Sequence, residues 1–117
     1  RLYRDLCLLM TKEQLWKDPQ LKRDELASRL GTNRTYVVEA VKVGTNGKTV
    51  TDFINSYRLR NASELLLQDA KMPMVEIAEK CGFNYRSTFG RIFYEYYGMS
   101  PSAFRKEGKN KRTKENV

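Results

Sequence analysis

Apolar residues recur every three or four positions along most of this chain, the spacing that gathers them on one face of an α-helix. The first such stretch runs from Tyr3 to Trp16, and an Asp-Pro pair then breaks the pattern. In "LKRDELASRLGTNRTYVVEAVKVG" two shorter stripes end at Gly31 and Gly44, which predicts two short helices joined by a tight turn. No run of residues alternates as a strand would, so the pattern predicts an all-α fold.

A longer helix is predicted in the middle of the chain, where Thr49 stands as its cap with Asp52 three residues later. Its apolar stripe consists of Phe53, Ile54, Tyr57, Ala62, Leu65 and Leu66. Two more short helices are expected around Gly82, and "SPSAFRK" predicts a last helix with Ser100 as its cap and Pro101 at its first position. The pattern thus predicts about seven helices.

The two pairs of short helices form a diverged internal repeat. Ala27 matches Ala78 and Gly31 matches Gly82 at an offset of 51, while Val37 matches Phe89 and Val41 matches Phe93 at an offset of 52. A small residue before a turn glycine, followed by a helix with apolar residues four apart, is typical of a helix-turn-helix. We therefore expect a first helix-turn-helix within residues 1–48, a linker helix over 49–68, a second helix-turn-helix within 69–108 and a flexible basic tail over 109–117.

The charge of the chain points to polyanionic partners. Its 117 residues include 22 basic and 14 acidic side chains, a net charge of +8, and residues 105–117 alone carry 6 basic and 2 acidic ones. Such a surplus favours nucleic acid or an acidic membrane surface. The longest apolar run, "LCLLM", is far too short to span a bilayer, so we expect no membrane contact by this segment.

Enzymatic chemistry is the least favoured reading of the composition. The chain has no histidine, and its two cysteines have no CxxC spacing, so neither a metal site nor a Cys-His pair can be assembled. No pair of carboxylates converges in the sequence to act as general acid and base. We expect no enzyme activity, no cofactor and no metal.

A helical projection separates buried from outward positions in the second helix of each pair. With Val37 at the centre of the buried face, the outward residues of the first unit are Arg34, Thr35, Val38, Glu39 and Lys42. With Phe89 at the centre, Tyr85, Ile92, Phe93 and Tyr96 are expected in the core. The outward residues of the second unit are then Arg86, Ser87, Gly90, Arg91 and Tyr94. The two outward faces are in phase and largely cationic, as two helices entering successive major grooves would be.

The sequence resembles the DNA-binding domain of the AraC family of bacterial transcription regulators over essentially Arg23 to Lys106. The resemblance is carried by "ELASRLGTNRTYVVEAVK", "GKTVTDFINSYRLRNASELLL" and "MVEIAEKCGFNYRSTFGRIFYEYYGMSPSAFRK". It implies two helix-turn-helix subdomains joined by a long helix, sequence-specific binding of double-stranded DNA and no enzyme activity. It also implies a cytoplasmic, nucleoid-associated protein with RNA polymerase as a further partner.

The opening segment, up to "GTNRTYV", also resembles output domains at the C-terminal end of two-component sensor-regulators. This resemblance implies a sensor or dimerisation domain on the N-terminal side of Arg1.

The resemblance implies that outward residues of both recognition helices contact bases and phosphates. These residues are Arg34, Thr35, Val38, Glu39, Lys42, Arg86, Ser87, Gly90 and Arg91. Arg34 and Arg86 can each donate two hydrogen bonds to a guanine edge, and Val38 can meet a thymine methyl group. Phosphates suit Lys42, Lys48, Arg91 and the backbone amides of the helix that begins near Thr49.

Two positions depart from the family pattern. Glu39 stands where a basic or polar residue is common, and its carboxylate would repel phosphates unless it accepts from a cytosine amino group. Lys22 replaces a serine-like cap, so that helix start depends on Asp24 and Glu25 interacting with the helix dipole.

Several alternatives stay open at this point. Arg58 and Arg60 are better read as structural or solvated than as base readers. Tyr36, Tyr94 and Tyr97 could contact phosphates or cap a small core. A helical protein-interaction module is the rival function, and a binder of structured RNA is less favoured because the A-form major groove is too narrow for a helix.

Overall fold

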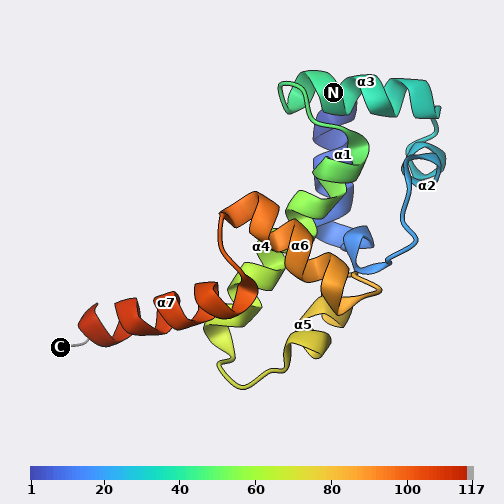
Figure 1. Ribbon diagram of the computed structural model, residues 1–117. Helices are drawn as coiled ribbons and strands as arrows, with labels where there is room; N and C mark the ends of the chain where they lie inside the picture. Colours follow the sequence, from blue (N-terminus) through green and yellow to red (C-terminus); the bar gives the residue numbers. More distant parts are fainter. Residues whose placement is uncertain (116–117) are drawn as a thin grey trace. The chain divides into compact units, whose positions relative to one another are not determined.

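A computed structural model describes residues 1–115, with side chains as far as residue 109. Within residues 1–115 the chain forms seven α-helices and one short 3-10 helix, and no strand (Figure 1). The elements are α1 Leu2–Glu13, η1 Leu15–Lys17, α2 Arg23–Arg29, α3 Arg34–Gly44, α4 Val50–Gln68, α5 Met74–Lys80, α6 Arg86–Tyr97 and α7 Pro101–Glu115. The predicted all-α fold of two helix-turn-helix units joined by a long helix is confirmed.

The first helix ends earlier than predicted. Gln14 adopts a left-handed conformation with φ 52°, and its backbone N–H donates to the carbonyl of Met10. This cap closes α1 at Glu13 and redirects the chain into the short helix η1. The turn brings Trp16 into the core, where it is only 4% exposed.

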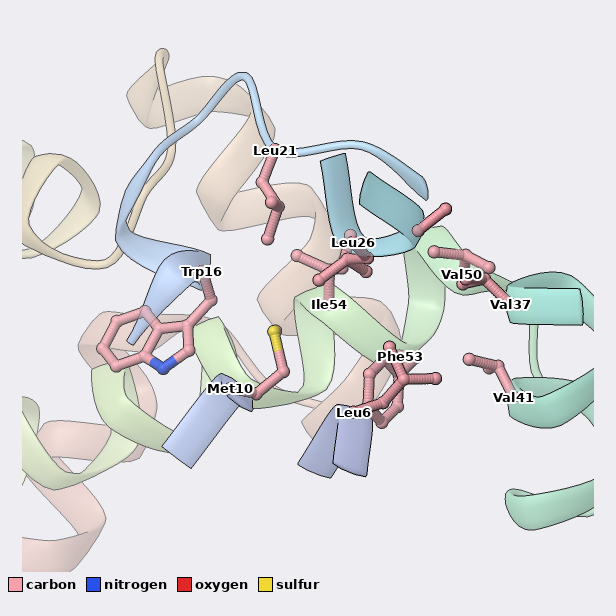
Figure 2. Close-up of a cluster of buried hydrophobic side chains, with 11 residues drawn as sticks. Leu6, Met10, Trp16, Leu21, Leu26, Val37, Val41, Val50, Phe53 and Ile54 are labelled. Carbon is pink, nitrogen blue, oxygen red and sulfur yellow. The ribbon is translucent and has the colours of Figure 1, made fainter. Parts of the chain in front are cut away.

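The chain divides into two compact units, residues Arg1–Tyr57 and Arg58–Val117. The core of the first unit gathers side chains from α1, η1, α2, α3 and the start of α4. Figure 2 shows ten labelled members of this cluster: Leu6, Met10, Trp16, Leu21, Leu26, Val37, Val41, Val50, Phe53 and Ile54. The packing of α1 and α4 against Val37 and Val41 fixes the buried face of α3, and therefore its outward face.

The core of the second unit is rich in aromatic rings. Phe89 and Phe93 of α6 are almost completely buried, and their centroids lie 5.7 Å apart. Phe104 of α7 lies 5.4 Å from Phe93 and from Tyr97. Because burying one such side chain contributes about 1.5–3 kcal/mol, this cluster fixes the rotation of α6 about its axis.

The expected burial of Tyr85 and Tyr96 is wrong. Tyr85 is 69% exposed because it is the extended N-cap residue that precedes α6, so the helical projection does not apply to it. Tyr96 is 49% exposed. Its place in the core is taken by Tyr97, whose ring lies 4.5 Å from that of Phe93 and whose hydroxyl donates to the carbonyl of Leu59 at 3.4 Å.

Helix starts follow the sequence closely. The Thr49 hydroxyl accepts from the N–H of Asp52 at 3.1 Å, and the Ser100 hydroxyl accepts from the N–H of Ala103 at 3.1 Å. Lys22 is the N-cap of α2 and offers no side-chain hydrogen bond, so the first turn carries only Asp24 and Glu25 for the dipole. The predicted caps at Thr49 and Ser100 are confirmed, whereas the interaction of Asp24 and Glu25 with the helix dipole stays a prediction.

Arg105 of α7 closes the end of α4. Its guanidinium donates to the carbonyls of Leu66 at 3.3 Å, Asp69 at 3.0 Å and Met72 at 2.9 Å. These carbonyls belong to the last turn of α4 and to the loop before α5, where no intrahelical donor remains. One side chain therefore holds α7 against the segment that leads into α5.

The C-terminal segment is more helical than predicted. The backbone of α7 continues from Pro101 to Glu115, through most of the stretch expected to be a flexible tail. Residues 116 and 117, the end of that predicted tail, lie outside the described residues.

Candidate nucleic-acid interface

The turns that introduce α3 and α6 have the same hydrogen bonds. In the first unit the N–H of Thr32 donates to Ala27 at 2.9 Å and that of Gly31 to Ser28 at 3.3 Å. In the second unit the N–H of Phe83 donates to Ala78 at 2.9 Å and that of Gly82 to Glu79 at 3.2 Å. Both turns are Schellman motifs, which place a glycine in the left-handed region. Gly31 and Gly82 have φ 64° and 86°, so the repeat seen in the sequence is a structural repeat.

The change of offset from 51 to 52 falls inside these turns. Four residues, 30–33, separate α2 from α3, whereas five residues, 81–85, separate α5 from α6. The two helix starts also differ, because the side chain of Asn33 accepts from the N–H of Tyr36 at 3.0 Å. Tyr85 provides no such cap to α6, which leaves its first amides for another acceptor.

The outward face of α3 carries the residues expected from the sequence. Arg34, Thr35, Glu39 and Lys42 are all exposed. Val38 differs, since it is half-buried and packs against the first core, so that less of it faces solvent than the projection implied. Glu39 also lines an open groove between α1 and α3, together with Arg1, Leu2, Asp5, Thr32, Tyr36, Ala40 and Val43.

Lys48 and Thr49 lie on the loop that leaves α3 and enters α4. Asn46 has φ 61°, and the N–H of Gly47 donates back to the carbonyl of Lys42 at 2.7 Å. The N–H of Lys48 donates to the Thr45 hydroxyl at 2.9 Å. The loop is therefore ordered by its own hydrogen bonds, and it presents two exposed residues at the positive end of a helix.

The outward face of α6 carries Arg86, Ser87 and Arg91, all exposed. Arg91 pairs with Glu95 one turn later at 3.3 Å, and both side chains are 63% exposed. An ion pair as open as this one contributes little and can be exchanged for another anion.

Gly90 lies among these residues in the interior of α6. A Cβ atom added to Gly90 would meet nothing within 4 Å, outside its own helix and chain neighbours. Gly44 is different, because a Cβ there would run into the ring of Tyr3. Packing within the chain therefore explains glycine at position 44 but not at position 90.

Sequence reasoning left Tyr94 out of the main set of contact residues. Its side chain is 60% exposed, so it does not cap the core. The signal was present in the repeat, since an offset of 52 pairs Tyr94 with Lys42. Tyr36 is equally open at 62%, whereas Tyr97 is structural.

The two arginines of α4, Arg58 and Arg60, differ in their exposure to solvent. Arg58 is only 8% exposed, and its guanidinium carbon lies 5.9 Å from the centroid of the Phe83 ring. Its structural role is thereby confirmed. Arg60 is exposed.

The comparisons with known proteins agree with this geometry. A family model described as a helix-turn-helix domain matches residues 26–107. The chain belongs to the AraC-type helix-turn-helix family. This AraC-type domain is a DNA-binding module of transcription regulation, and the resemblance inferred from the sequence is confirmed.

Individual relatives support the same assignment. The Msm operon regulatory protein of Streptococcus mutans is 32% identical over 90 residues, which are 77% of this chain and 32% of that protein. The probable transcription factor PqrA of Proteus vulgaris is 30% identical over 95 residues, 81% of this chain and 76% of PqrA. The C-terminal domain of AraT, a response regulator from Geobacillus stearothermophilus, has the same fold with a TM-score of 0.82 at 22% identity, covering 92% of this chain and 85% of that one.

This AraC-type domain spans only part of the length of several relatives, such as the 32% of the Msm operon regulatory protein. Among the described residues, none of the helices combines the length and the apolar character that crossing a bilayer requires. The same part of the chain contains no group of three or more His, Cys, Asp or Glu side chains able to hold a metal ion. Within the described residues Cys7 and Cys81 form no disulfide, and the side-chain amide of Asn61 donates to the Sγ atom of Cys81 at 3.6 Å.

Proposed function

We propose that the chain recognises specific sequences in double-stranded DNA, with α3 and α6 as recognition helices in successive major grooves. The observation that carries this proposal is the repeated Schellman turn, because it presents two outward helix faces in the same manner. A major groove about 12 Å wide accepts one α-helix, and successive grooves on one side of the duplex are about 34 Å apart.

The exposed residues of each unit fall into two roles. Arg34 and Arg86, in the first turns of α3 and α6, suit base edges, and Thr35 and Ser87 beside them suit either bases or phosphates. Phosphate contacts are assigned to Lys42, Lys48, Arg91 and the amides that follow Thr49. Gly90 is assigned to close approach of the helix to the duplex, Val38 to a thymine methyl group and Glu39 to a cytosine amino group.

The wider context of the domain is also part of the proposal. Relatives such as the Msm operon regulatory protein are about three times as long as the segment they share with this chain, which supports a further sensor or dimerisation domain in the whole protein. The likeness to a C-terminal domain of a response regulator supports a position of that further domain N-terminal to Arg1. The likeness to the C-terminal domain of a response regulator supports an output role in two-component signalling. A transcription regulator of this kind would act in the cytoplasm at the nucleoid and could contact RNA polymerase.

A helical protein-interaction module is the competing function. The exposed rings of Tyr36 and Tyr94 would serve such a module. Both rings, however, lie on helices whose outward faces carry arginine or lysine, and single exposed apolar residues are ordinary on soluble proteins. The cationic faces favour DNA.

Titration of a fluorescent duplex followed by anisotropy tests the proposal. Affinity should fall steeply with salt, and Arg91→Ala should lower the salt slope by about 0.9, since one phosphate contact is lost. Lys71→Ala, in the α4–α5 loop, is a matched control that removes an exposed cation that belongs to neither α3 nor α6. Salt-insensitive binding, or an Arg91→Ala slope equal to that of the unaltered chain, would count against DNA recognition by α6.

A further inference from the structure

Tyr85 is an exposed aromatic residue directly before α6, and packing of the second unit does not account for it. Its side chain is 69% exposed, so its ring adds little buried apolar area to the core. Within the part of the chain that the structure describes, its hydroxyl makes no hydrogen bond and its ring contacts no other ring. The side chain of Tyr85 is therefore available to a partner.

The turn before α3 shows which residue would stabilise the start of such a helix. There the N-cap residue is Asn33, whose side chain accepts from the N–H of Tyr36 at 3.0 Å. At the offset of 51 that relates the two turns, Asn33 matches Asn84. Tyr85 follows as the extra residue of the longer turn, so it takes the N-cap position of α6, with φ −132° and ψ 137°.

A tyrosine at this position lowers the stability of the helix start. Asparagine, aspartate and serine are preferred at an N-cap because their short side chains accept from a backbone N–H, and Tyr85 makes no such bond. Departures from a local stability rule without a compensating contact inside the protein are typical of functional sites. The place of Tyr85 agrees with this, because it directly precedes Arg86, which the proposed function assigns to a base edge.

A phosphate of the DNA backbone is the partner that fits this side chain best. Tyrosine hydroxyls are among the groups that donate to phosphate oxygens, and such contacts fix the register of a protein on the duplex. Tyrosine is not among the side chains that pair with base edges in the major groove. A protein partner would need a wider apolar patch, and both neighbours of Tyr85, Asn84 and Arg86, are polar and exposed.

We propose that Tyr85 is a phosphate-contact residue. Its hydroxyl donates to a backbone phosphate at the edge of the major groove that α6 enters, and its ring lies against the adjacent deoxyribose. The contact fixes where α6 begins in the groove and carries no base preference of its own. The inference rests on the proposed function, since it requires that α6 enters a major groove.

Anisotropy titration of a fluorescent duplex that the unaltered chain has selected from a random library tests this inference. Tyr85→Phe removes only the hydroxyl and should lower the affinity roughly tenfold, since a hydrogen bond to a charged group is lost. The salt slope and the selected base preference should stay those of the unaltered chain, because a neutral donor replaces no counterion and reads no base. The urea midpoint should also stay the same, since Tyr85 does not cap α6 and phenylalanine has no group that could.

Tyr85→Asn separates the effect on stability from the effect on binding. It should raise the urea midpoint, because asparagine can cap α6 as Asn33 caps α3, and it should weaken DNA binding at least as much as Tyr85→Phe. Tyr96→Phe is the matched control, because it removes another hydroxyl of α6 from a side chain that is 49% exposed, and it should leave the affinity unchanged.

Full affinity of Tyr85→Phe would overturn the inference and leave the proposed function intact. The same conclusion would follow if Tyr85→Phe changed the selected base preference, or if Tyr85→Asn bound DNA as tightly as the unaltered chain. Failure of the unaltered chain to select or bind any duplex would instead refute the proposed function, and this inference with it.

Discussion

Substitutions of Gly90 test how α6 contacts its partner, because their effect on the free energy of unfolding can be measured separately from their effect on DNA affinity. Glycine in a helix interior costs roughly 0.5–1 kcal/mol relative to alanine, and at position 90 no neighbour requires it. Gly90→Ala should therefore raise the free energy of unfolding of the second unit by up to about 1 kcal/mol. A gain of this size is measurable as a higher urea midpoint with an unchanged m-value.

Gly90→Leu should keep most of that gain, since leucine is nearly as good a helix former as alanine and its Cβ meets open space. Its side chain, however, would stand on the outward face between Arg86 and Arg91 and hold the helix away from the base edges. Losing one well-placed base contact costs about 1–3 kcal/mol, so we expect DNA affinity to fall at least about fivefold. The two measurements should move in opposite directions.

Gly44→Ala is the matched control for this pair of variants. The added methyl group would clash with the ring of Tyr3, so this variant should destabilise the first unit where Gly90→Ala stabilises the second. The reasoning is refuted if Gly90→Leu folds normally and binds DNA as tightly as the unaltered chain. It is also refuted if Gly90→Ala lowers the urea midpoint, because then some contact within the protein would require the glycine.

Three further tests address other parts of the structure. Glu39→Arg gives the first unit the residue that the second has at the matched position, so binding to non-specific duplex should tighten and its salt slope steepen by about 0.9; an unchanged slope would place residue 39 away from DNA. Tyr94→Phe should weaken binding with no change of slope, whereas Lys42→Gln at the matched position should lower the slope by about 0.9, and equal slopes for the two would contradict these roles. Arg105→Ala should cost the second unit at least about 1.5–3 kcal/mol in urea unfolding, and Arg105→Lys should not restore it, since an ammonium cannot span three carbonyls; full stability of the lysine variant would contradict this account.

Helix positions could be read from the sequence because each helix buries one face and the period of that face is fixed. The caps at Thr49 and Ser100 and the turn glycines at 31 and 82 could also be predicted. Each cap accepts from a backbone N–H group, and each glycine adopts a positive φ. The hydrogen bonds of such caps and turns join residues only a few positions apart, so they can be predicted without knowledge of distant contacts.

The wrong assignments of Tyr85 and Tyr96 have a different origin. A helical projection gives the direction of a side chain but not which neighbours lie in that direction. The ring of Phe104 in α7 packs against Phe93 and Tyr97, so Tyr97 rather than Tyr96 belongs to the second core. The projection also assumed helix at Tyr85, where the turn is one residue longer than in the first unit. Arg105 was missed as a cap because its three acceptors lie 33 to 39 residues away in the sequence.

Because of the internal repeat, the exposed residues of the candidate site were easier to locate than the role of each residue was to assign. Matching Val37 with Phe89 fixes which face is buried in each unit, and hence which residues are exposed. This match does not give paired outward residues the same role. Glu39 of the first unit and Arg91 of the second occupy matched positions, and their opposite charges mean that only the arginine would attract a phosphate. The repeat therefore predicts the shared turns and the shared buried face, whereas the role of each outward residue has to be argued from its own chemistry.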